Sequence, residues 1–90
     1  MPQAVADPAE LRRFANALKR FTADLQGGLS AVHGQLTGLG DTWRDQEHDK
    51  FREEFEQTMH VLGCFVENAD LHIPFLLRKA ERVEDYLQQH

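Results

Sequence analysis

The fold of this chain is decided by the stretch Leu36-Thr37-Gly38-Leu39-Gly40-Asp41-Thr42-Trp43-Arg44-Asp45, near the middle of its 90 residues. Gly38 and Gly40 lack the β-carbon that disfavours left-handed backbone, so a helix can end here and the chain can reverse. Thr42 and Asp45 have the spacing of a capping box, with Asp in place of the usual Glu, at the start of a following helix. The stretch therefore predicts a turn over residues 37–42 between two helices.

Before the turn, residues 8–36 have the pattern of one long helix. Asp7 is a typical cap, Pro8 suits the first helical position, and Glu10 completes a capping box. From there, apolar residues recur at spacings of three and four, which is the seam of a helix that packs on another helix. The seam consists of Leu11, Phe14, Leu18, Phe21, Leu25, Leu29, Val32 and Leu36.

A glycine pair, Gly27 and Gly28, falls where this seam carries a stutter. Each glycine inside a helix costs roughly 0.5–1 kcal/mol relative to Ala, so one interpretation is a break between two shorter helices. The other is a continuous helix whose glycines form a notch where another backbone approaches closely. Because the apolar phase is the same on both sides of the pair, we favour a continuous helix with a crossing point at these glycines.

After the turn, residues 43–73 carry a second apolar seam. Its members are Phe51, Phe55, Thr58, Leu62, Phe65, Ala69 and Ile73, and the pattern continues at Leu76, Ala80, Val83 and Leu87. Pro74 lacks an N–H and clashes with the preceding turn, which predicts a kink or restart there and a helical tail over residues 75–88. Helices over 8–36 and 43–73 would each span ~43 Å, so the tail would run beyond the first helix or bend back across it.

Apolar residues off the two seams leave surface that a lone hairpin cannot cover. A second hairpin is the economical solution, because two hairpins can bury these faces in a four-helix bundle. The predicted fold is therefore all-α, with a single helical-hairpin domain over residues 1–90 that dimerises into a four-helix bundle.

Composition narrows the possible partners and compartments. The chain has 15 acidic and 10 basic side chains, for a net charge of −5, which disfavours nucleic acid and anionic membranes as partners. No apolar run approaches the ~20 residues of a membrane span, and the start lacks the basic and apolar regions of a secretory signal. Cys64 is the single cysteine, which excludes an internal disulfide. Its place between Leu62 and Phe65 predicts a buried, small apolar side chain.

No pattern points to catalysis, and we expect no enzyme, no cofactor and no metal. The chain has no glycine-rich phosphate loop and no Ser/His/Asp set in a supporting context. His60 lies one turn before Cys64, but a reactive thiol is not expected beside the core seam. Asp49, Glu53, Glu56 and His60 share one helical stripe. A dimetal bundle needs Glu-x-x-His motifs on facing helices, and the chain has none, so a solvated acidic face is the preferred interpretation.

The chain length, the two helices and the early tryptophan resemble the WXG (Trp-x-Gly, ESAT-like) superfamily of small type VII secretion proteins. The motif Trp43-Arg44-Asp45 matches at Trp and has Asp where the family usually has Gly. In that family, a Tyr-x-x-x-Asp/Glu motif near the C-terminus of one protomer lies near the Trp of its partner. Here Tyr86 supplies the Tyr, while His90 replaces the acid. The resemblance implies a composite secretion or recognition motif made of Trp43, Arg44, Asp45 and Tyr86.

The resemblance also implies a function. The chain would be a non-enzymatic substrate or partner of a type VII system, made in the cytoplasm without a cleaved signal peptide and secreted or displayed at the cell surface as a folded dimer. Its partner would be a second copy or a related small helical protein, with a secretion ATPase as a further candidate. The alternative is a cytosolic adaptor or secretion-chaperone-like hairpin that binds a partner helix. The residues expected to pack the helices or the dimer are Leu11, Phe14, Leu18, Phe21, Leu25, Gly27, Gly28, Val32, Phe51, Phe55, Leu62 and Phe65.

Overall fold

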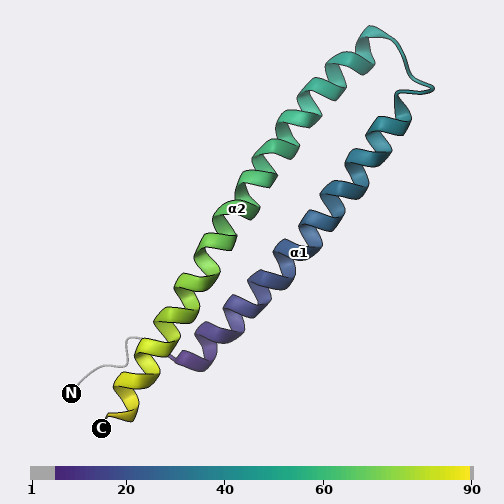
Figure 1. Cartoon of the computed structure of the whole chain (residues 1–90). Helices are drawn as coiled ribbons and strands as arrows, with labels where there is room; N and C mark the ends of the chain where they lie inside the picture. Colours follow the sequence, from purple (N-terminus) through teal and green to yellow (C-terminus); the bar gives the residue numbers. More distant parts are fainter. Residues whose placement is uncertain (1–5, 90) are drawn as a thin grey trace.

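Two long antiparallel helices make up the computed structural model, which describes residues 6–89 (Figure 1). Helix α1 spans Pro8–Leu39 and helix α2 spans Gln46–Gln88. They pack side by side into a rod with extents of 68 × 17 × 14 Å. The described residues contain no strand. The predicted all-α helical hairpin is therefore confirmed.

Helix α1 begins as predicted. The Asp7 carboxylate accepts a hydrogen bond from the backbone N–H of Ala9 at 2.9 Å, and Pro8 is the first helical residue. The helix runs without a break through Gly27 and Gly28, so the predicted continuity is confirmed. A crossing point with α2 at these glycines is wrong, because a β-carbon added at either one would meet nothing within 4 Å.

The turn lies three residues later in the chain than predicted. The loop covers residues 40–45 rather than 37–42, so α1 is longer and α2 starts later than expected. No described glycine has a positive φ, and Gly40 has right-handed angles of φ −62° and ψ −17°. The left-handed reversal predicted at Gly38 and Gly40 is therefore wrong.

Two side chains cap the helix ends at this loop, in roles different from those predicted. Asp45, not Thr42, caps α2, since its carboxylate accepts from the backbone N–H of His48 at 3.0 Å. The Thr42 hydroxyl instead donates to the carbonyl of Leu39 at the end of α1, at 3.3 Å. A carboxylate can only accept, which suits the free N–H groups at a helix start, whereas a hydroxyl can also donate to the free carbonyls at a helix end.

Helix α2 continues through Pro74 to Gln88, so the restart and separate tail predicted after this proline are wrong. Pro74 is exposed, and so is Asp70, whose carbonyl loses its helical N–H partner, so water can reach the gap. The seam residues on either side, Ile73 and Leu76, remain half-buried. Burial of this seam on both sides of the proline favours one continuous helix.

The core is a narrow seam between the helices. Its buried residues are Ala15, Thr22 and Leu36 on α1 and His48, Val66, Ala69 and Ala80 on α2. Small side chains dominate this seam, so the two helices approach closely without enclosing a large side chain. Cys64 is exposed, so its predicted burial is wrong. It lies two residues from Val66, on a different side of α2 from the residues that face α1.

An ion pair joins the start of α1 to the C-terminal part of α2. The guanidinium of Arg12 donates two hydrogen bonds to the carboxylate of Glu84, at 2.8 and 2.9 Å. Helical side chains lean toward the N-terminus of their own helix, so these two lean toward each other in an antiparallel pair. Only the last residues of α2 extend past the start of α1 (Figure 1).

Replacing Glu84 by Gln should lower the thermal midpoint at pH 7 and make it less sensitive to acid. The hydrogen bonds and charge of Arg12 hold the pKa of Glu84 below its ordinary value. The pair therefore stabilises the fold at neutral pH, and this stabilisation is lost as the pH falls through the lowered pKa. Both side chains are well exposed, so the effect should be small.

Thermal unfolding followed by circular dichroism between pH 7 and pH 3 measures the effect of Glu84→Gln. The control is Glu67→Gln, at an exposed site that makes no ion pair within residues 6–89. Equal midpoints for the two variants at pH 7 would contradict the prediction.

Candidate functional site: an apolar face and the hairpin turn

One side of the hairpin is lined by exposed apolar side chains from both helices. On α1, Phe14 and Phe21 are 59% and 53% exposed, and on α2 Phe51 and Phe65 are each 43% exposed. Phe21 and Phe65 meet edge to face across the two helices, with ring centroids 6.1 Å apart. We call this side of the hairpin the apolar face.

Two open grooves run along the apolar face. The larger has a volume of about 610 Å³ and is lined by Phe14, Leu18, Phe65, Asn68, Ala69, His72, Phe75 and Leu76. The second, of about 300 Å³, lies nearer the turn and is lined by Val32, Gln35, Leu36, Leu39, Phe51 and Phe55. No side chain of residues 6–89 fills either groove, so this part of the apolar face is open to another molecule.

The structure divides the residues predicted to pack helices into two sets. Those half-buried at the contact between the helices are Leu11, Leu18, Leu25 and Phe55. Those that stay exposed are Phe14, Phe21, Val32, Phe51, Leu62 and Phe65, together with Gly27 and Gly28. The most buried residues of the contact on α1 include small ones, such as Ala15 and Thr22, which the predicted seam did not contain. They are one position away from the predicted seam, and their apolar signal is weak.

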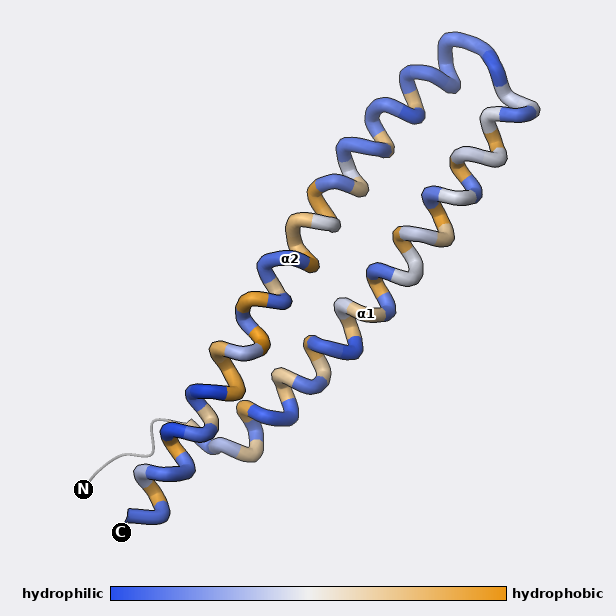
Figure 2. Tube along the Cα trace, viewed as in Figure 1, coloured by the Kyte–Doolittle hydropathy of each residue, from blue (hydrophilic) through white to orange (hydrophobic). Residues whose placement is uncertain are grey.

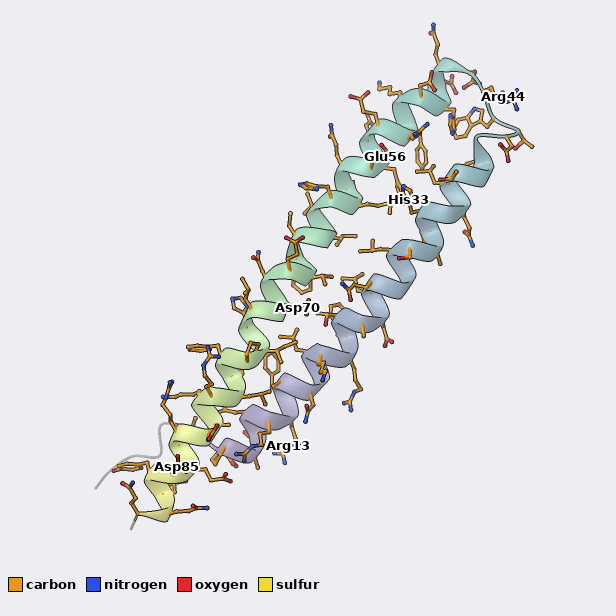
Figure 3. All side chains as sticks on the ribbon, viewed as in Figure 1. Arg13, His33, Arg44, Glu56, Asp70 and Asp85 are labelled. Carbon is orange, nitrogen blue, oxygen red and sulfur yellow. The ribbon has the colours of Figure 1, made fainter. Side chains whose placement is uncertain are left out.

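The turn presents Trp43 against a second aromatic cluster. The indole is half-buried and lies edge to face on the imidazole of His48, with centroids 5.0 Å apart. It also contacts the ring of Phe51 at 5.9 Å, and Phe51 stacks on Phe55 at 5.6 Å. Arg44 is exposed on the loop (Figure 3). The aromatic rings therefore link the turn to the groove nearest to it.

His48 is the largest buried polar side chain at the turn, and the sequence pattern did not predict its burial. It is only 5% exposed, and a β-carbon at Gly40 would lie 3.5 Å from its Cε1 atom. This is an ordinary van der Waals distance, so Gly40 is required neither for left-handed backbone nor for space beside His48. The spacing from Asp45 to His48, which is that of a cap and its third helical residue, could have indicated this arrangement.

The predicted recognition residues lie far apart within one chain. Trp43 is at the turn, and Tyr86 is in the last turns of α2, where it is exposed. Their sequence neighbours Arg44 and Asp85 mark opposite ends of the rod (Figure 3), which is 68 Å long. A single hairpin therefore does not bring Trp43 and Tyr86 together.

The polar side chains of α2 form no cluster that could hold a metal within residues 6–89. No three His, Cys, Asp or Glu side chains converge there to hold a metal. The acidic stripe near the turn includes Arg52, whose Nε lies 3.2 Å from a carboxylate oxygen of Glu56. The Cys64 sulfur lies 3.7 Å from His60 Nε2, with both side chains exposed to water.

Comparison with known families identifies the architecture. The family described as WXG100, proteins of 100 residues with WXG, matches residues 4–88. The chain belongs to the WXG100 family. WXG100 proteins are small ESAT-like proteins associated with type VII secretion. Searches of curated proteins and of solved structures return no match. No helix within residues 6–89 combines the length and the apolar character needed to cross a membrane.

In the stretch Trp43-Arg44-Asp45, Asp45 stands two residues after the Trp, where the family name has Gly, and the structure shows how the turn accommodates Asp45. Asp45 has extended backbone, with φ −106° and ψ −179°, which any residue adopts. Asp and Gly are both accepted as helix caps, but only Asp supplies a carboxylate for the free N–H of His48. The second helix of this chain therefore begins with a side-chain cap at Asp45.

Proposed function

We propose that this chain is a non-enzymatic substrate or partner of a type VII secretion system that acts as a folded dimer. The apolar face is the dimer interface, and Trp43, Arg44, Asp45 and Tyr86 form the recognition motif. The observation that carries the proposal is the row of exposed phenylalanines along the two open grooves. Large contiguous apolar patches on soluble proteins mark interaction sites.

The extended shape of the hairpin supports a second chain that buries the apolar face. The chain exposes 7081 Å², whereas a compact protein of its mass exposes about 5,400 Å². Its radius of gyration is 20.3 Å, against about 12 Å for a compact domain of this length. The excess of roughly 1,700 Å² exceeds the ~800 Å² that each partner buries in a standard interface.

The charge distribution favours an antiparallel arrangement of the two hairpins. Residues 24–57, around the turn, carry eight acidic and three basic side chains, whereas the rest of the chain carries seven of each. The first part of α2 is correspondingly hydrophilic in Figure 2. Two turns placed side by side would repel, while an antiparallel pair separates them. The same arrangement would bring Trp43 of one protomer to the end of its partner that carries Tyr86.

The solution mass by size exclusion with light scattering tests the dimer. We expect twice the chain mass of 10.4 kDa for the full chain. A version ending at Ile73 should dissociate, because it lacks Phe75 and Leu76 of the larger groove and the Glu84 partner of Arg12. A monomeric full chain would contradict the homodimer, and stable binding to a heterologous helical protein would then favour the adaptor role.

Export is tested in cells that carry a type VII system. Trp43→Ala and Tyr86→Ala should each reduce the amount of protein in the culture medium at least tenfold without lowering the cellular level. Ala23→Ser, at an exposed position of α1 away from both grooves, serves as the control. Unchanged export of both variants would overturn the recognition role.

A further inference from the structure

The hairpin turn contains a buried titratable group that has no role in the proposed function so far. Among the side chains of residues 6–89, the Nε2 atom of His48 is the buried polar atom without a hydrogen-bond partner. Its ring lies against Gly40 on one side and contacts the indole of Trp43 on another. Buried polar groups are nearly always paired, so an orphan atom at a recognition residue calls for an explanation.

Charged side chains near His48 in the chain come from α2 and from the loop. On α2, a carboxylate oxygen of Asp49 is 3.8 Å from Nδ1, and Asp45 accepts from the backbone N–H of His48. On the loop, Asp41 and Arg44 are exposed. On α1, residues 34–39 carry no titratable side chain. The Asp49 carboxylate therefore lies on the Nδ1 side of the ring, while Nε2 is buried without a hydrogen-bond partner.

The nearby carbonyl groups at the end of α1 already accept hydrogen bonds. The carbonyl of Thr37 accepts from Gly40 N at 3.2 Å, and that of Gly38 accepts from the backbone N–H of Asp41 at 3.1 Å. The carbonyl of Leu39 accepts from the backbone N–H of Trp43 at 2.9 Å. Each carbonyl oxygen could accept a second hydrogen bond, but Nε2 has no hydrogen-bond partner among the described residues. A proton on His48 Nε2 would be a buried donor without an acceptor, and the ring would carry a positive charge held away from water.

We propose that His48 is a positioning residue for Trp43, and that its protonation state sets how far the indole is exposed. The neutral imidazole packs under the indole and holds it half-buried at the end of the hairpin. The imidazolium leaves its place beside Gly40 for water, and Trp43 keeps only its contact with Phe51. The inference rests on the proposed function only for the role of Trp43 in recognition, to which it adds a response to acidification.

Trp43 is the only tryptophan, so its fluorescence reports on this site directly. Imidazole side chains change charge between about pH 5 and 8, so the full-length protein is titrated across that range. We expect the emission maximum to move to longer wavelength on acidification. The midpoint should coincide with the titration of the His48 ring followed by NMR on the same sample.

Three variants separate positioning from a general effect of acid. His48→Gln should abolish the step in emission, whereas His60→Gln, at an exposed position on α2, should retain it. His48→Phe keeps an aromatic ring under the indole, so its emission should stay at shorter wavelength over the whole range. Far-ultraviolet circular dichroism of each variant at both pH values verifies that the helices remain.

A pH-dependent change in Trp43 emission that persists in His48→Gln would overturn the proposal. A Trp43 emission that stays constant in the parent chain while the His48 ring titrates would also overturn it. The dimer mass and export of His48→Phe at neutral pH test the proposed function separately. If His48→Phe keeps its short-wavelength emission but neither dimerises nor is exported, the result would count against the proposed function. The same result would support the positioning role of His48. The two inferences can therefore fail independently.

Discussion

Replacing Ala15 by Glu should abolish the cooperative thermal unfolding of the hairpin. Ala15 has no exposed surface and lies in the seam where small side chains let α1 and α2 approach closely. A glutamate there finds no room, and an uncompensated buried charge costs about 3–5 kcal/mol. That is a large fraction of the stability of a domain of this length, about 5–13 kcal/mol. Circular dichroism during heating measures the loss.

The control for this seam variant is Ala23→Glu, which makes the same change at an exposed position of the same helix. Its thermal midpoint should stay within a few degrees of the parent chain, because a solvated glutamate is a good helix former. A cooperative transition in Ala15→Glu at the midpoint of Ala23→Glu would show that the helix contact lies elsewhere.

The double variant Phe14→Glu, Phe65→Glu should be a folded monomer. Both rings line the larger groove, and both are already exposed in the hairpin. Phe65 also meets Phe21 across the helices, but the buried seam between α1 and α2 is unchanged in the variant, so the hairpin should still fold. Burial of each Phe in a dimer contributes about 1.5–3 kcal/mol, so self-association should weaken at least ~100-fold. Light scattering over a concentration series measures this change, and circular dichroism verifies that the helices persist.

Leu71→Glu is the matched control for the apolar face. Leu71 is 70% exposed and lines neither groove, so a charge there should leave the dimer intact. A dimer that survives in the double variant would exclude the apolar face as the interface. Dissociation by Leu71→Glu alone would place the interface on another side of α2.

Local features of the chain determined which elements form and to which family the chain belongs. The start of α1 depends on Asp7 and Pro8, neighbours in sequence whose chemistry acts within one helical turn. The long runs of three- and four-residue spacing predict two helices, because that period occurs only in a helix. Trp43 beside a turn was sufficient to indicate the WXG superfamily, which the match over residues 4–88 confirms.

Packing of particular side chains decided what the sequence pattern left open. The turn moved to residues 40–45 because His48 packs against Gly40 and Trp43, and Asp45 caps the helix that carries it. Helix α2 continued through Pro74 because seam residues on both sides remain half-buried, an effect that local propensity does not contain.

The choice between two neighbouring apolar sides of each helix was likewise a tertiary one. Hydrophobic periodicity marks a broad stripe, and Ala15 and Phe14 lie next to each other on it. The small side chain of Ala15 faces the other helix because it lets the two backbones approach closely, and this close approach buries more of the surrounding surface. The large ring was left on the outside. The sequence determined that this chain forms a helical hairpin with broad apolar stripes. Packing of the two helices alone decided which side of each stripe is buried and which remains exposed.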